Sequence, residues 1–147
     1  MPALLAIALL ATAATAATPT LPAWLNGDWD PYSNAFRGLD GLTVKNSTLT
    51  WHDCENAPFD VVESKGNTVT IRLSPKAQCK LDDVPPTRMD VVRFTLRDNQ
   101  CDLSVSIYAS PEAAAKNEPS AEGLYGKAKC PSGPAAQAAA NLSTTPR

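Results

Sequence analysis

The chain has 147 residues, four cysteines and a formal net charge of −2, with 44% hydrophobic and 19% charged residues. The weak negative charge and the lack of any Lys/Arg cluster argue against a nucleic-acid-binding protein, because phosphate recognition needs a concentrated positive surface. No apolar run reaches the roughly 20 residues that a transmembrane helix requires. We therefore expect no membrane span in the mature protein and no nucleic-acid partner.

The N-terminal residues have the pattern of an export signal. The apolar run LLAIALL at 4–10 is followed by the small-residue string ATAATAAT, as in a cleavable signal peptide. We expect residues 1–17 to be that signal, with cleavage after Ala16 or Ala17, and the protein to be secreted or periplasmic. A buried or membrane-spanning helix fits less well, because Pro19 and Pro22 would end it soon after the run.

Residues 21–130 predict a single β-rich domain. Val69, Ile71 and Leu73 alternate with polar neighbours, which is the pattern of a strand with one solvent-exposed face. Similar short strands are predicted at 42–44, 48–51, 59–63, 68–73, 89–96, 103–108 and 123–129, with a long proline-containing loop at 74–88. The expected fold is all-β: a small antiparallel meander that forms a barrel or a sandwich of about seven or eight short strands.

Two further segments stand apart from the strands. A short helix is predicted near 111–116, with Ser110 as N-cap, Pro111 as the first helical residue, and Glu112 and Lys116 as an i,i+4 pair. Residues 131–147 contain no aromatic residue and one large aliphatic, Leu142. We expect a disordered tail there, because so little apolar surface cannot offset the entropy of ordering.

The four cysteines, Cys54, Cys79, Cys101 and Cys130, predict two disulfides in an exported domain. Three connectivities are possible. Strands that run alternately up and down bring Cys54 and Cys79 to one end of the meander, and Cys101 and Cys130 to the other. We therefore predict these two pairs. A zinc site is disfavoured, because no two cysteines have the spacing of about two to four residues that structural zinc sites use.

The segment Leu25-Asn26-Gly27-Asp28-Trp29 resembles the Gly-x-Trp signature that opens the first strand of lipocalin-like (calycin) barrels. The resemblance implies a barrel whose Trp packs across its closed end and which holds a small apolar ligand. It makes Gly27 and Trp29 residues of the barrel floor. In the family a later basic residue covers the Trp, and Arg93 and Lys127 are the two candidates.

Several residues are candidates for a catalytic, metal-binding or modification site. His52 is the sole histidine, and with no second histidine a metal site is not expected. Asp28 and Asp30 lie beside aromatic residues, as the paired carboxylates of a glycoside hydrolase do, but aspartates in Gly-Asp and Asp-Pro contexts are also common in turns. Asn46 and Asn141 begin glycosylation sequons.

The aromatic residues of the N-terminal half are the strongest binding candidates. Most are expected to fill the core, but two or more exposed together would mark a partner surface. The set comprises Trp24, Trp29, Tyr32, Phe36 and Trp51.

These observations favour an exported, non-enzymatic binding module, for instance an inhibitor or partner of another extracytoplasmic protein. One alternative is a lipocalin-like carrier of a small apolar ligand. Another is a secreted hydrolase that uses Asp28 and Asp30, or His52, and a third is a purely structural secreted protein. No catalytic residue, metal or cofactor is predicted for the leading interpretation.

Overall fold

The fold is that of a computed structural model, which describes residues 18–32, 39–51 and 54–130. The expected signal peptide (1–17) and tail (131–147) lie outside the described residues. The candidates Phe36 and His52 and the sequon at Asn141 lie outside them as well.

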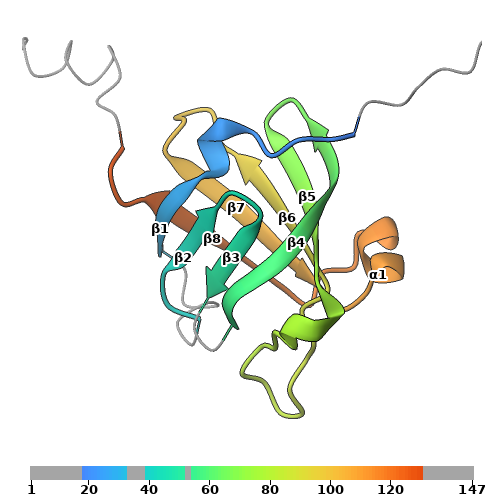
Figure 1. Cartoon of the computed structure of the whole chain (residues 1–147). Helices are drawn as coiled ribbons and strands as arrows, with labels where there is room; N and C mark the ends of the chain where they lie inside the picture. The colour runs from blue at the N-terminus through green and yellow to red at the C-terminus, as the bar shows by residue number, and fades with distance from the viewer. Residues whose placement is uncertain (1–17, 33–38, 52–53, 131–147) are drawn as a thin grey trace, which may run out of the picture.

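Eight antiparallel strands form a closed barrel (Figure 1). Each strand pairs with the next along the chain, and β8 closes the barrel against β1 through the pairs Trp29↔Lys127 and Pro31↔Tyr125. The predicted meander is thus a barrel and not a sandwich. The strands are β1 (Gly27–Pro31), β2 (Leu42–Lys45), β3 (Thr48–Trp51), β4 (Cys54–Lys65), β5 (Thr68–Leu73), β6 (Val91–Leu96), β7 (Asp102–Tyr108) and β8 (Ala121–Lys127).

Strand β4 is the main departure from the predicted boundaries. It begins at Cys54 and has 12 residues, whereas the sequence pattern predicts a strand only at 59–63. The sequence pattern does not predict the first half of β4, because it contains Asn56 and Pro58 and both residue types normally interrupt strands. Asn56 adopts φ 47° where the register between β3 and β4 shifts, so this part of the strand is irregular but remains paired.

The predicted short helix is present as α1 (Pro111–Lys116) on the outside of the barrel. The hydroxyl of Ser110 accepts a hydrogen bond from the N–H of Ala113, as an N-cap does. The helix ends at Asn117, which is left-handed at φ 56°. A second, smaller cluster of Val91, Tyr108 and Ala114 attaches α1 to the barrel wall.

Side chains from all eight strands meet in one core inside the barrel. The inward positions follow the two-residue alternation of each strand; in β6, for example, Val92, Phe94 and Leu96 point inward. The largest fully buried side chains of this core are aromatic: Trp29, Trp51, Tyr125 and Phe94.

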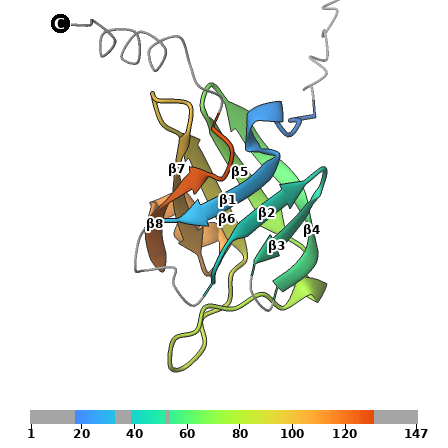
Figure 2. The same ribbon diagram turned by 90° about the vertical axis from the view of Figure 1, so that its left-hand side faces the viewer.

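The two ends of the barrel differ (Figures 1 and 2). The segment before β1, with the 3-10 helix η1 (Ala23–Leu25), crosses one end, where Leu25 is fully buried. From the other end the segment after η3 (Pro75–Ala77) projects away from the barrel. The predicted long loop 74–88 therefore contains the short 3-10 helix η3.

Both predicted disulfides are confirmed. Cys54 bonds to Cys79 with their Cα atoms 5.1 Å apart, and Cys101 bonds to Cys130 with Cα atoms 5.5 Å apart. The first closes the base of the projecting segment, and the second links the β6–β7 turn to the residues after β8. No helix among the described residues is long and apolar enough to span a membrane.

Candidate functional site

The end of the barrel near η1 is closed by Trp29. The residue is 1% exposed, and its indole N–H donates a hydrogen bond of 3.0 Å to the carbonyl of Leu25. The ammonium of Lys127 lies 5.1 Å from the centre of the Trp29 ring and donates to the carbonyl of Trp24 at 3.2 Å. Of the two candidates for the basic residue over Trp29, Lys127 is therefore the one in place. This end of the barrel is packed and braced.

An aromatic pair, Trp51 and Tyr125, lies in the barrel interior. The indole N–H of Trp51 donates to the hydroxyl of Tyr125 at 2.7 Å, and the two rings meet edge-on at 5.7 Å. The Tyr125 hydroxyl in turn reaches the carbonyl of Asp40 at 3.3 Å. Burial raises the pKa of Tyr125 well above its ordinary value, and the nearby Asp40 carboxylate adds to the effect.

The predicted aromatic binding residues do not gather on one surface. Trp29 and Trp51 are core residues, and Trp24 is half-buried against the core. Tyr32 is 63% exposed and lies over Gly126, where an added Cβ would meet the Tyr32 hydroxyl. Within the described part of this set, Tyr32 alone is a freely accessible ring.

The two candidate carboxylates lie on the outer face of β1. Asp28 is exposed and accepts a hydrogen bond from the hydroxyl of Thr43 at 2.8 Å. Asp30 is exposed too. Neither residue lines any of the hollows described below, and among the described residues no group of three or more His, Cys, Asp or Glu could hold a metal ion.

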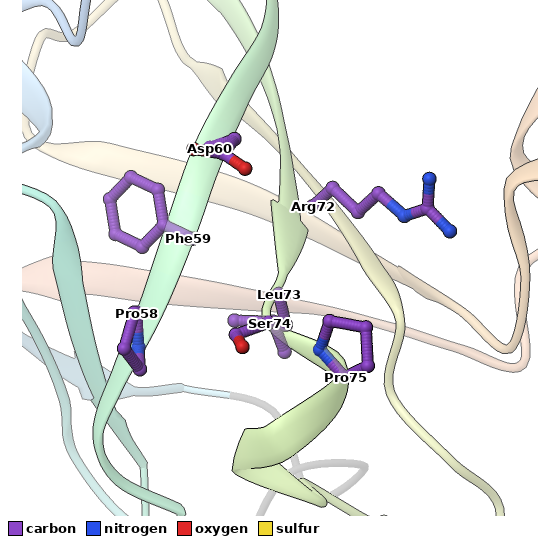
Figure 3. A pocket seen from close by; sticks show the side chains of 7 residues that line it. All are labelled: Pro58, Phe59, Asp60, Arg72, Leu73, Ser74 and Pro75. Carbon is purple, nitrogen blue, oxygen red and sulfur yellow. The ribbon is translucent and has the colours of Figure 1, made fainter.

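One hollow of about 410 Å³ lies where β4 and β5 approach η3. In Figure 3, Phe59 and Asp60 leave β4 in opposite directions, and Arg72 extends away from β5. Asp60 and Arg72 are cross-strand partners. The hollow is lined by Pro58, Phe59, Asp60, Arg72, Leu73, Ser74 and Pro75.

A second hollow of about 280 Å³, which we call the α1 groove, lies between α1 and the outer face of β4, β5 and β6. Val62 occupies a β-bulge in β4 and is 56% exposed at the groove. The hydroxyl of Thr70 is buried there and has no hydrogen-bond partner. Val62, Glu63, Thr70, Arg72, Val91, Arg93, Pro111, Ala114 and Ala115 line the groove.

Arg93 fixes one wall of the α1 groove. Its guanidinium donates to the Tyr108 hydroxyl at 2.8 Å, to the Asn117 side-chain oxygen at 2.7 Å and to the Ala114 carbonyl at 3.2 Å. It also lies 5.0 Å from the centre of the Tyr108 ring. A cation at the carboxyl end of a helix is favourable, so Arg93 anchors α1 to the barrel. The Arg72 side chain is 52% exposed, and its guanidinium lies 3.7 Å from the Asp90 carboxylate.

None of the residues that line the α1 groove was a sequence-based binding candidate. Arg93 was considered only as a cover for Trp29, and the groove exists because a bulge, a helix and three strands meet. The sequence signal that could have found it is Val61-Val62, two consecutive valines in a predicted strand, since one of them must face outward.

The molecule is thus a closed eight-stranded barrel with a packed interior, hollows on its exterior and a disulfide at either end. No protein-family model matches the sequence, and comparisons with curated proteins and with solved structures also give no match.

Proposed function

We propose that this protein is an exported, non-enzymatic binding module that recognises another extracytoplasmic protein through the outside of its barrel. One observation carries the proposal: the interior is occupied by packed side chains, including Trp29, Trp51 and Tyr125, whereas the hollows lie on the exterior. A ligand that displaced part of this core would do so at a cost of several kcal/mol. A partner can occupy the exterior hollows without that cost.

The two disulfides support the proposed location outside the cytoplasm, because such bonds persist in oxidising compartments. The resemblance to lipocalin-like barrels is supported by Trp29 at the closed end and Lys127 over its ring. We infer a small lipocalin-like barrel in which the ligand cavity is replaced by core packing.

The test is capture of a partner by the folded protein. The full chain is immobilised and exposed to the extracytoplasmic protein fraction of its source. The matched control is the same chain after its disulfides are reduced and alkylated. A protein retained by the folded chain alone, which then binds it in purified form, supports the proposal; no such protein across several growth conditions refutes it.

A second candidate function is the binding of a small apolar ligand in the α1 groove, and the apolar lining by Val62, Val91 and Ala114 favours it. These side chains would contact an aliphatic chain. Hexanol and hexanoate titrated into labelled protein should shift the amide signals of Thr70 and Ala114, and Val62→Asp should abolish the shifts. Unchanged spectra would exclude this function.

A further inference from the structure

The projecting segment between Cys79 and Met89 is a hairpin-like finger. Cys79 and Met89 are joined at its base by the hydrogen bond from the Met89 N–H to the Cys79 carbonyl, 2.9 Å long. The Lys80↔Arg88 bridge follows, and then a 2.7 Å bond from the N–H of Leu81 to the carbonyl of Thr87. Figures 1 and 2, a quarter turn apart, both show this 79–89 finger standing clear of the barrel end.

The base of the 79–89 finger packs into the core of the barrel. Cys79 and Met89 are 3% and 2% exposed and belong to the main core, and Leu81 joins them. The disulfide to Cys54 ties the outgoing side of the finger to β4. On the returning side, Arg88 donates to the carbonyl of Pro75 at 3.3 Å. Both sides of the finger are therefore held by the barrel.

The exposed tip of the 79–89 finger is restrained by hydrogen bonds and by two prolines. The Asp83 carboxylate accepts hydrogen bonds from both the backbone N–H and the hydroxyl of Thr87, and these bonds lower the pKa of Asp83. Pro85 and Pro86 follow Val84 and fix two backbone φ angles. Val84 itself is 98% exposed at the end of this braced structure. An apolar side chain on a fixed projection loses little entropy when a partner binds it.

We propose that the 79–89 finger is the part of the molecule that enters the partner, with Val84 inserted into a cleft that accepts a branched aliphatic side chain. This inference rests on the proposed function, because it identifies the contact through which the binding module acts. Pro85 and Pro86 have no N–H groups, so the cleft can receive no backbone hydrogen bond from these two positions and contacts their rings.

A hollow of about 210 Å³ beside the base adds a second contact. It lies between the finger and the barrel end, and a side chain from the rim of the partner's cleft can occupy it while Val84 is inserted. It is lined by Leu39, Cys54, Gln78, Cys79, Lys80, Leu81, Asp82 and Pro86. A projection flanked by a hollow fits a cleft with a raised rim better than it fits a flat surface.

The first experiment places a photo-reactive amino acid at position 84 or at position 62 of the full chain in its native host. The position-62 probe reports on the α1 groove. We expect cross-linking from position 84, with the linked peptide located in a cleft of the partner. Cross-linking from position 62 alone would overturn the proposal that the 79–89 finger enters the partner, but it would leave the proposed function intact. Cross-linking from neither position, together with failed capture by the folded chain, would refute both.

The second experiment compares Val84→Asp with Leu124→Asp, the same kind of change at an exposed aliphatic residue that lines none of the hollows described above. The purified partner should bind Val84→Asp at least about tenfold more weakly than the wild type, as for a residue at the centre of an interface. Leu124→Asp should change the affinity by less than about threefold, as for a residue outside the contact. Thermal unfolding verifies that both variants remain folded. If Val84→Asp binds the partner with unchanged affinity, the proposal that Val84 inserts into the partner is refuted.

Discussion

Replacement of Tyr125 by phenylalanine should make the stability of the barrel less sensitive to alkaline pH. In the wild type the Tyr125 hydroxyl lies in the core and accepts the indole N–H of Trp51 at 2.7 Å. Burial raises its pKa above the ordinary value near 10. As the pH passes about 10, the tyrosine of the unfolded chain loses its proton while the native one retains it, so the unfolded state is favoured.

The magnitude follows from proton linkage. At about pH 11, one unit above the unfolded pKa, the wild type should lose about 1.4 kcal/mol of unfolding free energy through Tyr125 alone. Tyr125→Phe lacks this ionisation. At about pH 8 it should be less stable than the wild type by about 1–3 kcal/mol, because Trp51 loses its hydroxyl acceptor. The difference between the two proteins should therefore shrink by about 1.4 kcal/mol as the pH rises from 8 to 11.

Guanidinium unfolding with intact disulfides, followed by tryptophan fluorescence, measures this difference. Other groups that titrate in the alkaline range affect both proteins and cancel in the comparison. A stability difference that stays constant between about pH 8 and about pH 11 would refute the reasoning, because the hydroxyl would then ionise equally in both states.

Three further predictions concern the closed end, the disulfides and α1. Lys127→Met removes the cation over Trp29 and a backbone hydrogen bond, and should cost about 1–2 kcal/mol in chemical denaturation. The double variant Cys101→Ala/Cys130→Ala opens a loop with a sequence separation of 29 and should cost about 3–4 kcal/mol in the chain-entropy account, measured in the same way. Ser110→Ala removes the N-cap of α1 and should cost about 1 kcal/mol, with faster amide exchange confined to that helix.

Each of these predictions has a control. Lys127→Arg keeps the cation and should retain most of the stability; a loss equal to that of Lys127→Met would argue against the contact with the ring. Non-reducing peptide mapping should return Cys101 with Cys130, and any other pairing would contradict the barrel. Ser110→Thr preserves a capping hydroxyl and should exchange like the wild type; if Ser110→Ala also does, the cap contributes nothing.

Much of the strand pattern could be predicted from the sequence because strand periodicity is a local property. Val69, Ile71 and Leu73 alternate with polar residues, and β5 has the predicted bounds. The α1 cap was predicted for the same reason, since Ser110 acts only three residues away. β4 shows the limit of this reasoning: Asn56 and Pro58 disfavour a strand locally, yet cross-strand pairing extends β4 through them.

The sequence could not say which of the candidate site residues are accessible, because exposure depends on the whole fold. Five aromatic residues were grouped as binding candidates by their nearness in sequence, and most of them were expected to fill the core. Trp29 and Trp51 are buried on the inner face, whereas Tyr32 lies outside. The α1 groove and the 79–89 finger leave no periodic signal, so neither was predicted; in the sequence the finger is a proline-containing loop like many others.

The sequence by itself determined an all-β chain, its helix cap and the partner of each cysteine. These follow from residue alternation, turn chemistry and the up-and-down path of a meander, all of which act between neighbours along the chain or between adjacent strands. Only the tertiary structure decided that β8 closes on β1, that Lys127 and not Arg93 covers Trp29, and that Trp51 binds Tyr125 across 74 positions. The physical reason is that closure depends on the accumulated twist and register of all eight strands, which no short segment encodes.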